Sequence, residues 1–290
     1  MEEKKYKLTE ESISFNGRTL YRIVAIRDFS TIKKGDKGGF IESESNLSHD
    51  GNAWVSDNAK VFGNARVYCD ARISDNARVS GNAEVYGHAW LYGKAIVCYN
   101  AVVCGNALVS GEARVIGKAK VFGKARVYDS AKIYGKSEVY GDAEVFGNSW
   151  IHCNAIVYDS AKIYGETEVY GHSKICGNAI VFGNANISGN VCVSGNAKVY
   201  ESADVSGNAH ICGNAKIYGD SFVHGNAWIN GNAKVYGNAE VYDEADISDN
   251  AEVYDNAEVY GEAEVFGNAK VCGYAYIDGN AYIGGDEEVR

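Results

Sequence analysis

Five histidines lie in the repetitive part of the chain and are its first candidates for general acid–base chemistry. An imidazole that acts as a base needs an orienting partner and a concave site with little water. Two of the five replace Asn at the corner of a repeat, where a solvated side chain is the simpler interpretation. Two others share one column but are predicted about 19 Å apart, too far to share a metal ion. The corner pair is His88 and His172, the column pair is His152 and His224, and the fifth is His210.

The chain also has eight cysteines, but none of them forms a CxxC motif. Cys176 and Cys212 share one face and are predicted about 9.6 Å apart, beyond the reach of a disulfide. Scattered thiols without an export signal are typical of a reducing compartment, so the cytoplasm is the expected location. Five cysteines are expected to fill half-exposed corners: Cys98, Cys104, Cys176, Cys212 and Cys272. These patterns predict no catalytic set, no metal site and no cofactor.

Composition and charge exclude several classes of protein. The 290 residues include 34 Gly and no Pro, which excludes collagen and proline-rich disorder. The formal net charge of −10 argues against a general attraction to nucleic acid or to an anionic membrane. No apolar run approaches the roughly 20 residues that span a bilayer. Residues 1–15 lack the apolar segment of a signal peptide. No membrane association is therefore expected.

A six-residue repeat runs without insertion or deletion from Gly51 to Gly284, which makes 39 hexads. Its third position is Ala in 33 hexads, and its fifth is Val, Ile or Leu in all 39. These two positions point to the same side of an extended strand, so they can fill a narrow interior. Gly and Asn at the first two positions favour a corner, because they enter left-handed backbone conformations at low cost.

A short strand and a corner every six residues, with no helical pattern, predict an all-β solenoid. Three sides close one triangular coil of 18 residues, so the hexads give about 13 coils. Stacked backbone hydrogen bonds and ladders of corner Asn are expected to stabilise the coils. The sequence divides into an amino-terminal β cap with a degenerate first coil (residues 1–50), a hexapeptide-repeat β-helix (51–284) and a charged carboxyl-terminal tail (285–290).

The first fifty residues break the repeat and are expected to cap it. The segment ISFNGRTLYRIVAIRDF predicts two strands around a turn at Asn16 and Gly17. The segment KKGDKGGFIES predicts a second turn that leads into a degenerate coil through Ile41 and Leu47. A cap is needed because the first coil otherwise exposes unpaired backbone, against which other molecules can stack.

The opening of the chain resembles the YdcK-like hexapeptide-repeat proteins of bacteria and phages, through the segments YKL, IRDF, KGDKGGFIES, NLS and GNAWV. The rest of the chain resembles them only as a repeat. The resemblance implies a left-handed parallel β-helix and, because hexapeptide proteins are often trimers, a homo-oligomer. Members are usually labelled transferases because of their fold, and fold alone is a weak warrant for activity.

The same resemblance leaves two further functions open. Hexapeptide acyltransferases use a His as general base and bind an acyl-CoA donor between coils, often beside a loop that leaves the prism. No hexad is interrupted here to supply such a loop, so an acyltransferase would have to assemble at an oligomer interface. The other alternative is a phage-type inhibitor of a host defence or nucleic-acid-binding enzyme, whose acidic faces mimic nucleic acid.

The variable fourth and sixth positions should face outward, and on one side of the triangle they form a predicted binding strip. Its sixth positions carry an aromatic ring on eight successive coils: Tyr128, Phe146, Tyr164, Phe182, Tyr200, Tyr218, Tyr236 and Tyr254. Its fourth positions contribute four lysines: Lys162, Lys198, Lys216 and Lys234. Stacked rings either stiffen an edge or offer a partner rigid contact area, and both interpretations stay open.

The next side of the triangle is mainly acidic at its fourth positions, as at Glu168, Asp204 and Glu240. The strip fits an acidic protein segment, a glycan or single-stranded nucleic acid, and nucleic acid is the least expected of the three because the acidic side would repel phosphate. An apolar girdle occupies four successive fourth positions: Trp90, Ile96, Val102 and Leu108. Exposed apolar belts usually mark contact with another protein, so any self-association is expected there. Together these features predict a non-catalytic interaction or scaffold protein with a protein partner.

Overall fold

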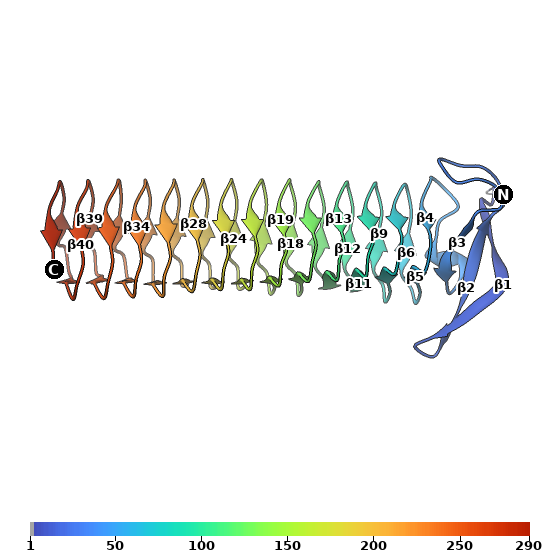
Figure 1. Cartoon of the computed structure of the whole chain (residues 1–290), viewed down its shortest axis with the longest axis horizontal. Coiled ribbons are helices and arrows are strands. Elements are labelled where there is room, and N and C mark those ends of the chain that lie inside the picture. Colours follow the sequence, from blue (N-terminus) through green and yellow to red (C-terminus); the bar gives the residue numbers. More distant parts are fainter. Residues whose placement is uncertain (1–2) are drawn as a thin grey trace. The chain divides into compact units, whose positions relative to one another are not determined.

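The computed structural model describes residues 3–290, which form two compact units, residues 3–142 and residues 143–290. Each unit is a parallel β-solenoid, in which short strands stack coil on coil into three sheets (Figure 1). The described residues contain one helical element, the 3-10 turn η1 (Glu44–Asn46). No helix among residues 3–290 is long and apolar enough to cross a membrane.

The first unit contains the cap strands and the early hexads. Its first sheet comprises β1 (Tyr6–Phe15), β2 (Arg18–Ala25), β3 (Lys37–Ile41), β5 (Lys60–Val61), β8 (Arg78–Val79), β11 (Ile96–Tyr99), β14 (Arg114–Gly117) and β17 (Lys132–Ile133). Its second sheet comprises β4 (Trp54–Val55), β7 (Arg72–Ile73), β10 (Trp90–Leu91), β13 (Leu108–Val109) and β16 (Arg126–Val127). Its third sheet comprises β6 (Arg66–Val67), β9 (Glu84–Val85), β12 (Val102–Val103), β15 (Lys120–Val121) and β18 (Glu138–Val139).

The second unit repeats the same three-sheet pattern. Its first sheet comprises β20 (Trp150–Ile151), β23 (Glu168–Val169), β26 (Asn186–Ile187), β29 (Asp204–Val205), β32 (Phe222–Val223), β35 (Glu240–Val241), β38 (Glu258–Val259) and β41 (Tyr276–Ile277). Its second sheet comprises β19 (Glu144–Val145), β22 (Lys162–Ile163), β25 (Ile180–Val181), β28 (Lys198–Val199), β31 (Lys216–Ile217), β34 (Lys234–Val235), β37 (Glu252–Val253), β40 (Lys270–Val271) and β43 (Glu288–Val289). Its third sheet comprises β21 (Ile156–Val157), β24 (Lys174–Ile175), β27 (Cys192–Val193), β30 (His210–Ile211), β33 (Trp228–Ile229), β36 (Asp246–Ile247), β39 (Glu264–Val265) and β42 (Tyr282–Ile283).

Each of the 39 hexads contributes one strand, β4 to β42, which confirms the predicted all-β solenoid. The two inward columns are buried, as at Ala197 and Val199, both 0% exposed. Burial of each aliphatic side chain contributes about 1.5–3 kcal/mol. Where a hydroxyl replaces Ala, it donates to the carbonyl three residues earlier, as Thr167 Oγ1 does to Tyr164 O at 2.7 Å. That bond satisfies a buried polar group, so the core tolerates the exchange.

The corners depend on the first residue of each hexad, which has a left-handed backbone, as at Gly177 with a φ of 67°. A Cβ there would lie 2.9 Å from the backbone nitrogen of Gly195 in the next coil. Glycine is therefore favoured for space as well as for conformation. Asp is the usual substitute, and its carboxylate accepts a bond from the next coil, as Asp159 does from Gly177 N at 3.1 Å.

The second residue of each hexad supplies the predicted Asn ladders. The side-chain amide of one Asn donates to the side-chain oxygen of its equivalent one coil on, at 2.9–3.1 Å in the longest ladder. That ladder comprises Asn178, Asn196, Asn214, Asn232, Asn250 and Asn268, and it ends on Asp286. Each inner member both donates and accepts, so the exposed corner is held without a cross-link.

The cap has the predicted hairpin and degenerate coil. Strands β1 and β2 pair antiparallel around Asn16 and Gly17, whose φ values of 52° and 73° suit a tight hairpin turn. Strand β2 pairs antiparallel with β3, and β3 then pairs parallel with β5. Leu47 forms a further parallel bridge to Val67. The cap thus changes from antiparallel pairing to the parallel stacking of the solenoid within β3.

Asn46 joins the cap to the first complete coil. Its side chain is fully buried, and Nδ2 donates to Gly63 O and Ala65 O, both at 2.9 Å. Its Oδ1 accepts bonds from Ser43 N at 3.0 Å and Glu42 N at 3.2 Å. Three of these backbone groups, Gly63 O, Ala65 O and Ser43 N, have no backbone partner, and one amide satisfies them all.

Two further buried side chains complete this joint. Tyr6 donates its hydroxyl to Leu47 O at 2.7 Å, and burial raises the pKa of that phenol. Lys5 donates Nζ to Gly51 O at 3.0 Å, and burial lowers the pKa of the amine to about 8. The exposed carbonyl edge of the first coil thus meets donors from the cap, as the capping argument requires.

The repeat continues beyond its predicted end at residue 284. Residues 285–290, assigned above to a charged tail, form a further hexad whose strand β43 pairs with β40. Glu287 stands at the third position, where the repeat has Ala, and Val289 keeps the fifth. The acidic replacement at an inward position concealed this hexad in the sequence.

We predict that Asn46→Ala lowers the stability of the first unit by about 2–4 kcal/mol, because it leaves the carbonyls of Gly63 and Ala65 buried without donors. The midpoint of urea unfolding measures the loss. The control is Asn64→Ala, which removes one exposed bond to Asn82 and is expected to cost less than about 1 kcal/mol. Equal losses in the two variants would contradict the role of Asn46.

Candidate binding surfaces

The most regular surface of the second unit is a ladder of aromatic rings beside its second sheet. Neighbouring ring centroids are 4.8–5.1 Å apart, with interplanar angles of 2–13°. Seven of the eight predicted aromatic residues are brought together in it: Phe146, Tyr164, Phe182, Tyr200, Tyr218, Tyr236 and Tyr254. All seven are half-buried, so each ring packs against its neighbours and presents an edge to the surface.

The hydroxyl groups of this ladder differ in what they bind. The Tyr236 hydroxyl donates to Glu252 Oε2 at 3.0 Å. The hydroxyls of Tyr200 and Tyr218 have no hydrogen-bond partner within residues 3–290. Burial raises the pKa of both phenols, so they remain proton donors at neutral pH. The centre of the ladder therefore offers two donors to a partner.

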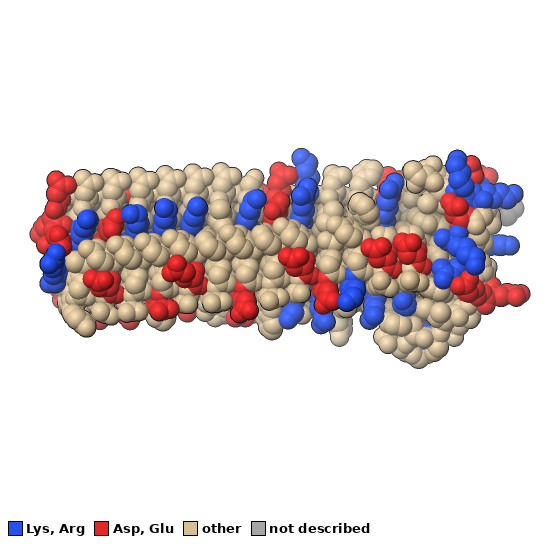
Figure 2. All heavy atoms as spheres, in the orientation of Figure 1, with Lys and Arg blue, Asp and Glu red and all other residues tan. Residues whose placement is uncertain are grey.

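A column of lysines runs along the same sheet as the ladder, and Figure 2 shows a row of basic side chains there. Lys198, Lys216 and Lys234 are register partners on the successive strands β28, β31 and β34. Lys234 Nζ forms an ion pair with Glu252 at 2.7 Å. Lys198 and Lys216 have no ion pair with any residue that the structure describes. Two adjacent positive charges thus lie next to the two free tyrosine hydroxyls.

Two further members of the predicted strip are Lys162, which is already paired, and Tyr128, which belongs to the other unit. Lys162 forms an ion pair with Glu144 at 3.5 Å, so its charge is already compensated. Tyr128 belongs to the first unit, where it lines a hollow of about 380 Å³ together with Leu108 and Arg126. Among the four predicted lysines, Lys198 and Lys216 are therefore the two without an ion pair in residues 3–290.

The apolar girdle encircles one coil of the first unit rather than forming a flat patch. Trp90 and Leu108 are register partners on β10 and β13 of one sheet. Ile96 and Val102 lie on β11 and β12, in the other two sheets. Trp90 is 44% exposed, and its Nε1 donates to Ser74 Oγ at 3.2 Å. A flat partner could therefore contact Trp90 and Leu108 together but not all four side chains.

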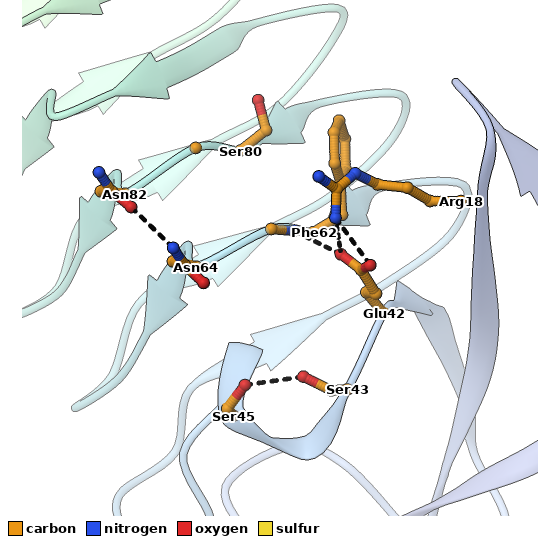
Figure 3. A pocket seen from close by; sticks show the side chains of 10 residues that line it. Arg18, Glu42, Ser43, Ser45, Phe62, Asn64, Ser80 and Asn82 are labelled. Carbon is orange, nitrogen blue, oxygen red and sulfur yellow. Dashed lines mark hydrogen bonds and ion pairs between the residues drawn. The ribbon is translucent and has the colours of Figure 1, made fainter.

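Hollows also lie where the cap meets the solenoid (Figure 3). One of about 430 Å³ is lined by the Arg18–Glu42 ion pair, with an Nη1–Oε1 distance of 2.8 Å. Glu42 Oε2 also accepts a bond from Gly63 N at 2.6 Å. This bond and Arg18 hold the pKa of the Glu42 carboxyl below its usual value. These charged groups bind one another and so join the cap to the solenoid.

Most histidines have surroundings that explain them without catalysis. His172 is an exposed corner residue, as expected, and His88 Nδ1 lies 3.7 Å from Asp70 Oδ2 with a largely exposed side chain. Two others stack on rings of the next coil, His210 on Trp228 and His224 on Tyr242. No group of three or more His, Cys, Asp or Glu side chains in the described part of the chain is arranged to hold a metal ion.

His152 is different, because it contacts two functional groups that the sequence analysis missed. Its Nε2 lies 2.8 Å from Glu168 Oε1, and its Nδ1 lies 3.2 Å from Cys153 Sγ. A spacing of 16 residues in the sequence could have predicted the contact with Glu168. This spacing places the side chain at the sixth position of one hexad beside the side chain at the fourth position of a hexad in the next coil. Tyr68 reaches Glu84 by the same spacing.

Comparison with known proteins supports the resemblance noted in the sequence. Residues 71–87 match the family described as YdcK Beta solenoid repeat. A protein of Escherichia coli (strain K12), named Uncharacterized acetyltransferase YdcK, is 36% identical over 62 residues, which cover 19% of this chain and 19% of that protein. The chain is thus YdcK-like in its β-solenoid repeat, and the match spans only about a fifth of the relative's length.

We predict that replacing both Tyr200 and Tyr218 by Ser lowers the melting temperature, because each ring is half-buried and stacked on two others. The loss should be about 1–3 kcal/mol for the two rings. Thermal unfolding followed by circular dichroism measures it. Tyr274→Ser is the control, since this ring is 86% exposed and makes no ring contact in the described structure. An unchanged melting temperature in the double variant would show that the ladder is not structural.

A second prediction concerns the girdle. If the first unit self-associates, Trp90→Lys combined with Leu108→Lys should reduce the mass in solution, because both side chains lie on one face. Light scattering coupled to size exclusion measures the mass, and circular dichroism checks that the fold is kept. Ile96→Lys, on another sheet, is the matched control. An oligomer that survives the double change would rule out this face.

Proposed function

We propose that this YdcK-like β-solenoid is a non-catalytic binding protein, whose second unit holds an acidic segment of a partner protein along its lysine and aromatic columns. The proposal rests on the stack of Lys198, Lys216 and Lys234. Within residues 3–290, one lysine of this stack, Lys234, has an ion pair with a carboxylate, and the other two have none. Like charges directly opposite one another in a sheet are destabilising. Carboxylates from a partner would remove that cost on binding.

The spacing of the column suits an extended acidic segment. Stacked lysines are about 4.8 Å apart, and alternate side chains of an extended peptide are about 6.8 Å apart. The flexible lysine side chains can bridge this difference, because each has four rotatable methylene groups. The hydroxyls of Tyr200 and Tyr218 supply further donors, and their stacked rings provide contact area that is already ordered. Binding would then cost little side-chain entropy, because the stacked rings are already ordered in the free protein.

The surroundings of the strip favour a protein over nucleic acid. Glu168, Asp204 and Glu240 lie on the neighbouring sheet, and a long phosphate backbone would meet their charge. A short acidic segment can stay on the lysine column. Homo-oligomer formation through the girdle would use residues of the other unit and none of the strip.

Two other functions rest on resemblance. The Escherichia coli relative is named an acetyltransferase, which supports an acyltransferase assembled at an oligomer interface. The acidic columns support an inhibitor of a host defence or nucleic-acid-binding enzyme. Neither explains why two stacked lysines lack counter-ions, and the binding proposal does.

We predict that Lys216→Gln weakens binding of a fluorescein-labelled peptide of alternating Glu and Ala by about tenfold, without lowering the melting temperature. Glu252→Gln should strengthen binding, because it frees Lys234. Fluorescence anisotropy at low ionic strength measures both. Lys174→Gln is the matched control, since it removes the same charge from an exposed fourth position on another sheet. Equal effects of Lys216→Gln and Lys174→Gln would contradict a specific strip.

A further inference from the structure

Three side chains at one corner of the second unit are arranged as a nucleophile, a base and a group that orients the base. Cys153 Sγ lies 3.2 Å from His152 Nδ1, and His152 Nε2 lies 2.8 Å from Glu168 Oε1. Cys153 is exposed, and its backbone is left-handed with a φ of 61°. The thiol is thus open to a reactant while its hydrogen-bond partner is fixed. This is the arrangement that nucleophilic attack by a cysteine requires.

Glu168 determines which nitrogen of His152 carries the proton. A carboxylate only accepts hydrogen bonds, so the Nε2–H of the neutral imidazole donates to it. Nδ1 then keeps its lone pair and faces the thiol of Cys153, from which it can take a proton. The ring of Tyr170 lies parallel to the imidazole, with centroids 5.0 Å apart and planes at 4°. The imidazole is therefore held in both its position and its tautomer.

The backbone of the same corner supplies a donor for an oxyanion. At an equivalent corner the Asp159 carboxylate accepts a bond from Gly177 N, the first nitrogen of the hexad one coil on. The corresponding nitrogen for Cys153 belongs to Gly171. Its N–H has no hydrogen-bond partner among residues 3–290. A negative oxygen on a group bound to Cys153 would meet a donor that another corner uses for a carboxylate.

We propose that Cys153 is a nucleophile that accepts an acyl group from a thioester. Acceptance of one acyl group is stoichiometric, so it agrees with a protein that binds its partner without catalysis, and it uses no residue of the binding strip. A thioester suits the open corner because its leaving group is a thiolate, as is the attacking group. The free energy of such an exchange is close to zero, because one thioester is converted into another. No strong acid is needed to protonate the leaving group. Amides and alkyl esters have poorer leaving groups and would need a more enclosed acid.

The step balances within the three side chains and the thioester. His152 Nδ1 takes the proton from Cys153 Sγ, and the sulfur attacks the thioester carbonyl carbon. A new carbon–sulfur bond forms, and the carbonyl oxygen becomes an oxyanion near the N–H of Gly171. The bond to the original sulfur then breaks, and the departing thiolate takes the proton from His152. The products are S-acyl Cys153 and a free thiol, with His152 returned to its neutral form.

The chain contains its own control for this site. Cys69 and Cys153 are its two exposed cysteines, and both are first residues of a hexad with a left-handed backbone. The residue before Cys69 is Tyr68, whose hydroxyl donates to Glu84 Oε2 at 3.1 Å. The two corners thus share exposure, conformation and a carboxylate 16 residues after the preceding side chain. They differ in the preceding residue, which is Tyr68 for Cys69 but His152 for Cys153, and the His152 imidazole lies within hydrogen-bond distance of the thiol.

The test uses the whole chain and the acetyl thioester of N-acetylcysteamine as the probe. Peptide mass spectrometry follows acetylation of Cys153 and Cys69 in the same sample, and neutral hydroxylamine confirms a thioester product. We expect Cys153 to react about 10²-fold faster than Cys69, and His152→Ala to remove this difference. Added imidazole should restore much of the rate in His152→Ala. Glu168→Gln should slow Cys153 about tenfold and leave Cys69 unchanged.

Equal rates at the two cysteines in the wild-type chain would overturn the proposal, as would full reactivity of Cys153 in His152→Ala. The melting temperature of each variant separates lost chemistry from lost structure. The acetylation rate of Cys69, which is exposed and lies in the first unit, measures how fast the probe reacts with an accessible cysteine outside the proposed site. Binding of the acidic peptide to the lysine column should stay unchanged in Cys153→Ser, so failure of one proposal leaves the other standing.

Discussion

Stacking of each residue on its equivalent 18 residues later is the constraint on which the rest of both units depends. Backbone N–H groups of one coil donate to carbonyls of the next at sides and corners alike, as Asn196 N does to Gly213 O at 2.7 Å. Each outward side chain therefore has its own kind as a neighbour wherever the sequence repeats. For Asn and for aromatic rings this is favourable, since both can bond or pack with themselves. For lysine it is unfavourable, so an uncompensated lysine stack needs another explanation.

A diagonal contact with a spacing of 16 residues brings unlike side chains together. It joins the sixth position of one hexad to the fourth position of a hexad in the next coil. Tyr236 meets Glu252 in this way, and His152 meets Glu168. The vertical spacing builds the prism and its ladders, whereas the diagonal spacing combines a donor with a carboxylate or a base with its orienting group. Chemistry in a regular solenoid is therefore expected along its diagonals.

The interior and the cap could be predicted from sequence because each depends on local or periodic rules. Two buried positions per hexad were enough to place the core, and the turn at Asn16 and Gly17 was enough to place the hairpin. The tail was misplaced because Glu287 replaces the small inward residue at an end where the interior is no longer enclosed. The pairing of lysines was not predictable, since column membership does not show which carboxylate a flexible side chain will reach.

Cys153 shows why the candidate chemistry was harder to predict than the fold. Its position in the hexad is one at which glycine is favoured, so a pattern-based analysis treats it as a tolerated corner residue. Its significance comes from His152 at the preceding position and from Glu168 in the next coil, and neither residue departs from the repeat. An unbroken solenoid has no inserted loop with which to enclose a substrate. Reactions and partners suited to it are therefore those that an open surface can serve: contact with an extended segment, or exchange between groups of similar energy.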